Sequence, residues 1–319
     1  MRAKLHFMNI EVIPIKRLPR GLSPTWTYFV AAKQEKNIKL RQIVEVPFRN
    51  KLTNAVVVKI NKTGKKARII KTVSAVITPF PFLTPEQLKL AEFISQTYFT
   101  SLSTALLGFL PNLPKRLSSK SDGRTKQTTK KKSQQTLYLV PEHQRVKQLI
   151  TQLPNYSITN TIHWRESQSK REFLNNWLKV ANGEIKTIVG TRSALLAPFS
   201  NLSEVVMEDE YDDSYKSEQS PRLHAREVAE ELARLHKAKL TYKTSAPSLE
   251  LYANQKNKIS NHQIINKITI VDIRKERENE NYSNLSETLQ DAVKKAISDK
   301  QQVLLFHNRK GHSTSATCK

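Results

Sequence analysis

The chain has 319 residues, of which 38% are hydrophobic and 25% are charged, a composition that predicts a globular protein of two domains. It contains no apolar run of about 18 residues, so no membrane span is expected, and its N-terminus lacks the features of a secretory signal. The single cysteine, Cys318, excludes an internal disulfide framework and a multi-cysteine zinc site within this chain. We therefore expect a cytoplasmic protein without a structural metal.

The strongest global signal is charge. Lysine and arginine number 53 against 28 acidic residues, which gives a formal net charge of +25. Such a surface attracts polyanions because bound cationic groups release counterions from the phosphate backbone. Charge therefore predicts nucleic-acid binding, although a ribosome-associated protein or a lysine-rich proteome would give the same signal. It carries no information about sequence specificity.

Residues 1–83 have the pattern of a small β-domain. The segments 27–30, 43–46 and 55–58 are rich in β-branched and aromatic residues. Proline, asparagine and glycine separate these segments. Short strands at such spacing predict a small antiparallel barrel or sandwich.

A helix is predicted directly after this region. Thr84 is a suitable N-cap, Pro85 occupies the first helical position, and Gln87 completes a capping box. An apolar stripe that includes Leu88 and Ile94 follows at helical spacing, and it predicts ordinary core packing.

The composition changes between residues 114 and 135. This stretch contains many lysines and arginines, among them Lys130, Lys131 and Lys132, and only one acid, Asp122. Because apolar periodicity is absent, we expect a flexible basic linker. It could contact phosphates or serve only as a tether.

From residue 136 onward, short apolar runs alternate with helical patterns. A helical pattern occupies residues 225–236. Strands and helices in alternation predict a parallel sheet covered on both faces. The predicted strands include residues 137–140, 187–189, 205–207, 268–271 and 303–306.

The second half contains a series of short polar and charged motifs. They are Gly190-Thr191-Arg192-Ser193, Glu208-Asp209-Glu210, Arg222-Leu223-His224-Ala225-Arg226, Ser245-Ala246-Pro247-Ser248 and Asn308-Arg309-Lys310-Gly311. In order and spacing these motifs resemble those of the primosomal protein N′ family of replication-restart DNA helicases. The resemblance implies an incomplete RecA-like α/β lobe over 136–267 and the start of a second motor lobe over 268–319. It singles out Arg192, Arg222, His224, Asn308 and Arg309.

The first half resembles the same family more loosely and implies a 3′-end DNA-binding domain over 1–113. Trp26-Thr27-Tyr28 lies where the family has Phe-Asp-Tyr, and residues 44–49 resemble Val-x-Val-Pro-Phe-Gly. Thr27 and Arg49 depart from those patterns. Trp26 and Tyr28 could equally be barrel core. The residues expected to contact DNA are Trp26, Thr27, Tyr28, Arg49, Lys71, Lys130, Lys131 and Lys132.

The nucleotide-binding loop of this family has no counterpart in the sequence. A P-loop reads G-x-x-x-x-G-K-[ST], and its backbone amides and lysine hold phosphates. Only Gly64 of the seven glycines precedes a lysine, and Lys59 stands where the first glycine is needed. The P-loop and the winged helix would fall between residues 114 and 136. Loss of the P-loop strand would leave a gap in the sheet unless its neighbours close up.

The acidic box is altered as well. The resemblance implies that its first Asp holds Mg²⁺ and the next Glu positions water, whereas this chain has Glu208 and Asp209 there. Reading Asp209-Glu210 instead would move the side chains to the other strand face. We interpret Glu208, Asp209 and Glu210 as a degenerate catalytic box, and favour a solvated acidic strand end.

The sequence therefore leaves three hypotheses. The first is a DNA-binding protein of the replication-restart primosome family that recognises forked, branched or single-stranded DNA without ATP-driven unwinding. Its partners would include the primosome or single-strand-binding proteins, and it would need neither ATP, Mg²⁺ nor zinc, although the family uses them. The second is an active ATP-dependent 3′-to-5′ DNA helicase. The third is a truncated, largely non-functional product.

Overall fold

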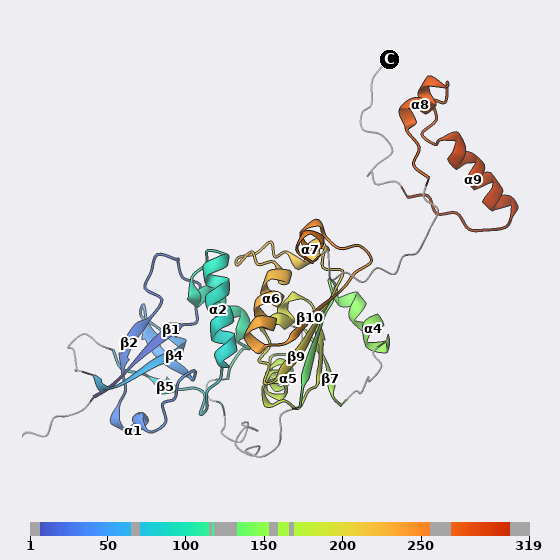
Figure 1. The fold of residues 1–319 in the computed structure, drawn as a ribbon. Helices are drawn as coiled ribbons and strands as arrows, with labels where there is room; N and C mark the ends of the chain where they lie inside the picture. The colour runs from blue at the N-terminus through green and yellow to red at the C-terminus, as the bar shows by residue number, and fades with distance from the viewer. Residues whose placement is uncertain are drawn as a thin grey trace, which may run out of the picture. The chain divides into compact units, whose positions relative to one another are not determined.

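The computed structural model describes residues 7–64, 71–114, 117, 133–152, 159–165, 169–255 and 269–306 (Figure 1). The chain divides into two compact units, Met1–Asn257 and Lys258–Lys319. The domain boundaries expected at 113/114, 135/136 and 267/268 remain predictions. An antiparallel sheet lies near the N-terminus and a parallel sheet follows it, so the expected mixed α/β fold class is confirmed.

The antiparallel sheet has the strand order β2-β1-β4-β3-β5. Its long strand β4 pairs with both β1 and β3, and shifts in the β1–β4 register mark irregularities that increase its twist. Valine, isoleucine and Tyr28 fill one face completely. The strands are β1 (Phe7–Pro14), β2 (Trp26–Phe29), β3 (Ile43–Phe48), β4 (Lys51–Gly64) and β5 (Ala75–Val76).

The segment 71–76 closes this sheet into a small barrel. The N–H of Phe29, at the end of β2, donates to the carbonyl of Lys71, and the N–H of Val73 donates back to Phe29. On its other side the segment bonds to β3, because Ser74 N–H donates to Glu45 and β5 pairs with Val44. Both edges of the sheet are thus occupied, as the pattern of short strands predicts.

Three helices accompany the barrel: α1 (Ala32–Glu35), α2 (Pro85–Thr97) and α3 (Leu102–Leu106). The predicted capping box of α2 is confirmed, because the Thr84 hydroxyl accepts from Gln87 N–H and the Gln87 side chain accepts from Thr84 N–H. Leu90, Ala91 and Ile94 face the core. A 3₁₀ turn, η1 (Leu107–Phe109), follows α3.

The parallel sheet has the strand order β10-β9-β6-β8-β7, and every neighbouring pair is parallel. β6 pairs directly with β9 on one side and β8 on the other, so the described sheet is continuous and the expected gap is not observed. The strands are β6 (Gln135–Leu139), β7 (Thr161–Trp164), β8 (Thr187–Gly190), β9 (Leu202–Glu208) and β10 (Lys239–Lys243).

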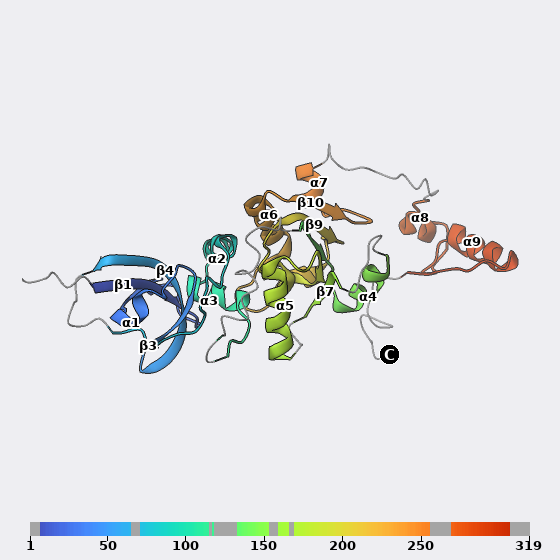
Figure 2. The ribbon, with the colours of Figure 1, turned by 90° about the horizontal axis from the view of Figure 1, so that it is seen from below.

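Helices cover both faces of this sheet (Figures 1 and 2). Alternate residues of β6 point to opposite faces: Leu137 and Leu139 join the main core, and Tyr138 packs in a smaller cluster with Val146 of α4. The helix expected over 225–236 is confirmed. The helices are α4 (His143–Gln152), α5 (Lys170–Asn182), α6 (Ala225–His236) and α7 (Leu249–Gln255), with 3₁₀ turns η4 (Arg192–Leu196) and η5 (Asp213–Tyr215).

One hydrophobic core runs from the barrel through α2 and α3 into the α/β part of this unit. The ring of Trp177 in α5 is fully buried and stacks on Phe82 with centroids 4.0 Å apart. Its indole N–H donates to the carbonyl of Phe109 at 3.2 Å. The Gln87 side chain of α2 donates to Leu196 in η4. These contacts join α2, α3 and the parallel sheet into one packed body.

The C-terminal unit corrects one expectation. Its described residues form α8 (Ile273–Glu278) and α9 (Glu287–Ser298), and the apolar runs at 268–271 and 303–306 are not strands where they are described. Ile270, Leu304 and Phe306 are 92%, 91% and 85% exposed. A β-strand needs a neighbour for its backbone groups and a buried face for its side chains. The described part of this unit supplies neither, so apolar composition was insufficient evidence.

The predicted basic linker falls mostly outside the described residues, and so do Lys130, Lys131 and Lys132. Leu117, which lies within that stretch, is buried and its N–H donates to the carbonyl of Ile77. At the other end, the Ser133 hydroxyl donates to Gly183. In the described part of the chain, no helix is long and apolar enough to span a membrane.

Gln135, the first residue of β6, is a fully buried polar side chain whose bonds are all satisfied. Its amide nitrogen donates to the carbonyls of Val180 and Ile185, each at 3.0 Å. Its oxygen accepts from the N–H groups of Ser200 and Asn201 at 2.7 and 3.1 Å. One side chain thus satisfies the backbone after α5 and before β9.

Replacing Gln135 with leucine should therefore destabilise the protein. The change leaves buried carbonyl and amide groups without partners, each at a cost of about 1–3 kcal/mol, so we expect a loss of at least ~3 kcal/mol in unfolding free energy. Urea denaturation measures it. The matched control is Gln134→Leu at the exposed neighbouring position, which should change stability by less than ~0.5 kcal/mol. Equal stability of the two variants would show that the Gln135 bonds contribute nothing.

Candidate functional site

A pocket of about 430 Å³ opens on the barrel, and it brings together five residues that the sequence selected for DNA contact. Trp26, Thr27 and Tyr28 come from β2, Arg49 from the turn between β3 and β4, and Lys71 from the closing segment. Its volume falls in the range of small-ligand pockets. The described residues that line it are Leu22, Trp26, Thr27, Tyr28, Pro47, Phe48, Arg49 and Lys71.

Aromatic rings form the apolar part of this pocket. Trp26 is half-buried and meets Phe48 edge to face, with centroids 5.0 Å apart and an interplanar angle of 83°. Tyr28 is buried, and its hydroxyl donates to the Pro47 carbonyl at 3.2 Å. Burial raises the pKa of the Tyr28 hydroxyl, so it remains a donor at neutral pH. Tyr28 is therefore both barrel core and pocket wall, and Trp26 presents surface to the pocket.

Arg49 occupies a strained backbone position. It forms with Asn50 the two-residue turn between β3 and β4, and their φ angles are 46° and 60°. Two positive φ angles define the hairpin turn that glycine and asparagine usually supply. The Arg49 guanidinium lies 5.6 Å from the centroid of the Phe48 ring. The chain thus places a cation at the pocket rim where glycine would be less strained.

The charge of the pocket is positive. Arg49 and Lys71 are exposed, and no acidic residue occurs among the described residues that line the cavity. The backbone of Lys71 is fixed by the bond from Phe29 that closes the barrel. Two cations beside exposed aromatic surface suit a ligand with a phosphate and a base.

The acidic box lies at the carboxyl end of β9, in the α/β part of the same unit. β9 ends at Glu208, and Asp209 adopts a left-handed conformation with φ of 44°. Side chains alternate between the two faces of the sheet only as far as Glu208. Asp209 and Glu210 lie beyond the strand, so the strand-face argument for the acidic box does not apply to them. Asp209 N–H donates to Lys243 at 2.8 Å, which ties this turn to the end of β10.

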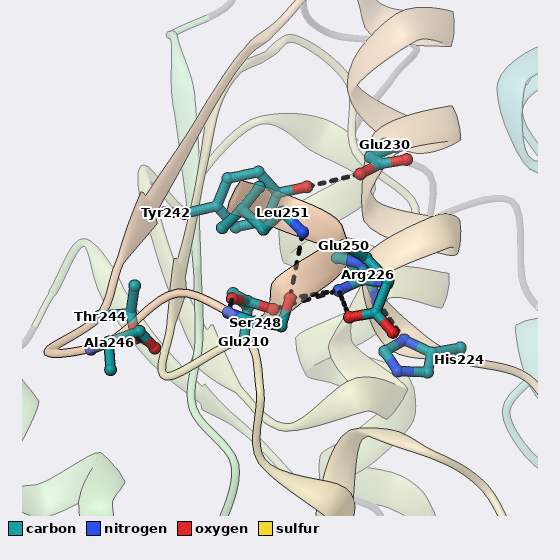
Figure 3. A network of polar contacts seen from close by, with 10 residues as sticks. All are labelled: Glu210, His224, Arg226, Glu230, Tyr242, Thr244, Ala246, Ser248, Glu250 and Leu251. Carbon is teal, nitrogen blue, oxygen red and sulfur yellow. Dashed lines mark hydrogen bonds and ion pairs between the residues drawn. The ribbon is translucent and has the colours of Figure 1, made fainter. Parts of the chain in front are cut away.

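Glu210 is buried, so the interpretation as a solvated strand end is wrong for this residue, whereas Glu208 and Asp209 are half-buried (Figure 3). Its carboxylate accepts from the Ser248 N–H at 2.7 Å and pairs with Arg226 of α6 at 3.2 Å. Arg226 also donates to the Ser248 hydroxyl at 2.8 Å and lies 3.8 Å from Glu250. A buried carboxylate needs such a partner because an isolated charge is strongly disfavoured there. Three motifs of the sequence thus meet in one network.

The other two acids are also engaged or shielded. Asp209 forms an ion pair with Arg145 of α4. Burial raises the pKa of the Glu208 carboxyl, and the nearby cations Lys243 and Arg145 lower it by a smaller amount. The Tyr215 hydroxyl donates to the Glu208 carbonyl at 2.8 Å, and burial raises the pKa of that hydroxyl.

This arrangement does not fit a Mg²⁺–nucleotide site. Mg²⁺ requires oxygen ligands in near-octahedral geometry, usually carboxylates together with substrate phosphates and water. Here Asp209 and Glu210 are paired with arginines, and the left-handed turn at Asp209 separates their directions. Within the described ranges, no cluster of three or more histidine, cysteine or acidic side chains could hold a metal ion. We derive no catalytic step from the box.

The remaining predicted residues have mixed placements. His224 is the N-cap of α6, where its Nδ1 accepts from Arg226 N–H, and burial lowers its pKa. Arg192 is exposed and donates to the Ser214 carbonyl at 2.6 Å, and Arg222 is exposed. Asn308 and Arg309 lie outside the described residues. Sequence reasoning missed Phe48 and Arg226, although both lie within segments that it had quoted.

Comparison with known proteins supports the family resemblance that the sequence motifs indicate. Residues 12–111 match the family profile of the PriA 3′DNA-binding domain (3′BD), and this range contains all five predicted residues of the barrel pocket. The chain is also similar to curated proteins named replication restart protein PriA.

Three of these similar proteins come from different bacteria. The Bacillus subtilis protein is 30% identical over 197 residues, which is 59% of this chain and 24% of that protein. The Rickettsia prowazekii protein is 34% identical over 198 residues, or 59% of this chain and 30% of that protein. The Haemophilus influenzae protein is 31% identical over 201 residues, which is 59% of this chain and 27% of that protein. The match thus spans between 24% and 30% of the length of these relatives.

Changing Arg49 to glycine should separate its effect on stability from its effect on binding. Glycine relieves the positive-φ strain, so we expect the unfolding free energy to rise by about 1 kcal/mol. The same change removes a pocket cation and should weaken DNA binding. Chemical denaturation and fluorescence anisotropy measure the two effects. Asn50→Gly is the control, because it changes the same turn without removing charge and should leave affinity unaltered.

Proposed function

We propose that this chain, a relative of the PriA replication restart proteins, binds DNA at forks or branched junctions by holding a strand end in the barrel pocket, without unwinding DNA itself. The observation that carries the proposal is the pocket, where five residues that the sequence resemblance had singled out line one cavity. The matched 3′DNA-binding domain supports it, since it covers the whole pocket. The similar Bacillus subtilis and Rickettsia prowazekii proteins are named replication restart proteins.

The chemistry of the pocket suits the end of a nucleic-acid strand. A terminal base can stack against Trp26, whose ring is held by Phe48, because every base has a π face. Arg49 and Lys71 can neutralise the adjoining phosphate, and the arginine can do so with two parallel hydrogen bonds. The Thr27 hydroxyl adds a donor and acceptor for the sugar. Such contacts favour an end over continuous duplex, which presents no free base.

The net charge of +25 adds affinity for any nucleic acid, whatever the structure of its ends. Each phosphate contact releases counterions, so binding should weaken steeply with salt. This general attraction would bring any nucleic acid to the surface. A preference for ends must therefore be measured against a substrate of the same charge.

The proposed lack of unwinding follows from the sequence and the acidic box. Phosphoryl-transfer motors need a phosphate-binding loop together with Mg²⁺-binding acids. The P-loop pattern does not occur in this sequence, and Asp209 and Glu210 pair with arginines. The primosome and single-strand-binding proteins as partners, and the cytoplasmic location, stay predictions.

End recognition should appear as a difference between two forks of equal length. One presents a free 3′ end at the junction, and in the other a hairpin loop closes that end. We expect about tenfold tighter binding to the open fork, consistent with stacking of one base plus a phosphate contact. Anisotropy at two salt concentrations measures both affinity and salt slope.

Two lysine variants test the assignment. Lys71→Ala should lose the preference for the open fork, whereas Lys33→Ala, an exposed lysine on α1 outside the pocket, should lose the same charge and keep the preference. Equal binding of both forks by the unmodified protein, with a steep salt slope, would reduce the function to general polyanion binding.

The absence of a motor is tested by ATP hydrolysis in the presence of forked DNA. We expect no difference in rate between the unmodified protein and Asp209→Ala, because the Asp209 carboxylate is already paired with Arg145. A DNA-stimulated rate that Asp209→Ala abolishes would instead show a working ATPase site and contradict the absence of a motor. Circular dichroism of the variant controls for loss of fold.

A further inference from the structure

Phe99 stands where packing cannot account for an aromatic residue. It follows the last turn of α2, with φ of 51°, and the Thr100 N–H donates back to Ser95 at 3.2 Å to close the helix end. Glycine or asparagine normally takes this left-handed position, because other residues are strained there. The Phe99 side chain is 71% exposed. It therefore gains little from burial and adds backbone strain.

The exposed Phe99 ring makes a cation–π contact with Arg20. The Arg20 guanidinium lies over it, 4.5 Å from the ring centroid. Because the side chain is so exposed, ring surface away from Arg20 remains accessible to a ligand. An aromatic ring beside an arginine is the arrangement on which single-stranded bases stack, irrespective of sequence.

Phe99 and Arg20 line one of three cavities that are connected to one another and to the barrel pocket by shared lining residues. That pocket shares Leu22 with a cavity of about 250 Å³, which in turn shares Arg20 with a cavity of about 360 Å³ lined by Phe99. The latter shares Arg17 with a cavity of about 550 Å³ whose wall includes Arg192. We call these three cavities beyond the barrel pocket the Phe99 groove.

The Phe99 groove is positively charged. Among the described residues that line it, three arginines face one acid, Glu92. None of the three, Arg17, Arg20 and Arg192, forms an ion pair with an acid in the described part of the chain. Arg192 donates to the Ser214 carbonyl, which fixes its direction and leaves further donors on its guanidinium. Serine and threonine side chains supply additional donors along the walls.

We propose that the Phe99 groove binds a single DNA strand that continues from the barrel pocket, with a base stacked on Phe99 and phosphates contacted by Arg17, Arg20 and Arg192. This inference rests on the proposed function, because it takes the strand end in the barrel pocket as its starting point. A single strand is the ligand that needs both features, since its bases are free to stack and its backbone carries the charge. The groove thereby extends the contact from the barrel to the α/β part of the unit.

The test compares short and long single strands. An oligothymidylate of about 3 nucleotides should reach only the barrel pocket, and one of about 12 should also occupy the Phe99 groove, within the usual size of single-strand sites. We expect Phe99→Asn to weaken binding of the long strand about tenfold and leave the short strand unchanged. Asparagine tolerates the left-handed conformation, so this variant should unfold at the same or a higher temperature than the unmodified protein.

Controls distinguish the groove from the pocket. Tyr282→Asn removes an aromatic ring of similar exposure from the C-terminal unit and should change neither affinity. Lys71→Ala should weaken binding of both strands, because both end in the barrel pocket. A strand with 2-aminopurine at successive positions should show stacking quench at one position, and Phe99→Asn should abolish it.

The outcomes separate the two proposals. If the long strand binds no tighter than the short one, or if Phe99→Asn and Tyr282→Asn affect it equally, the groove does not carry the strand. Binding of the short strand then keeps the pocket assignment separate from this failure. If neither strand binds the unmodified protein, the proposed function fails and this inference fails with it. Loss of quench in Phe99→Asn together with retained short-strand binding is the result that supports the groove.

Discussion

The stack of Trp177 on Phe82 is the contact on which the arrangement of this protein depends. Phe82 precedes α2, and Trp177 lies in α5, which covers the parallel sheet. Aromatic pairs contribute about 0.5–1.5 kcal/mol beyond their buried area, and the indole N–H adds a bond to Phe109 that no apolar ring could make. One side chain thus links the segment before α2 and the turn after α3 to the α/β part. This link, together with the shared core and the Gln87–Leu196 bond, holds the walls of the Phe99 groove in one body.

The acidic network at the end of β9 uses its carboxylates to hold the fold together. Carboxylates that bind Mg²⁺ must be available to it, whereas those that hold a fold together are paired. Glu210 joins the end of β9 to α6 and to the loop before α7, through Arg226 and Ser248. The network therefore ties the end of β9 to α6 and to the loop before α7 through an ion pair with a buried carboxylate.

Local features of the fold were predictable from the sequence, and long-range features were not. The cap of α2 at Thr84 depends on residues three positions apart, and the bounds of α6 follow from its apolar period, so both could be predicted. Closure of the barrel through Lys71 depends on pairing with Phe29, far away in the chain, and composition does not encode it. The burial of Glu210 depends on the left-handed turn at Asp209, which no periodicity reveals. The apolar run at 303–306 has strand composition but no described neighbour to pair with.

The same limits apply to the candidate site. Trp26, Thr27 and Tyr28 were selected as adjacent residues, whereas their meeting with Arg49 and Lys71 required the barrel to close. Phe48 was missed because it looks like an ordinary strand residue until Trp26 packs against its ring. Phe99 was missed for a different reason, since exposure and backbone conformation are properties of the folded chain alone.

Arg49 and Phe99 share a physical property that argues for their role. Each is a bulky residue at positive φ, each side chain is exposed, and each lines a cavity of the proposed strand path. Strain of this kind costs of order 1–3 kcal/mol, and neither residue offsets it by burial. Glycine would remove the strain at both positions and would also remove a cation from one cavity and a stacking surface from another. Within the fold each side chain makes a cation–π contact, Arg49 with Phe48 and Phe99 with Arg20, and the proposed strand would give both a further partner.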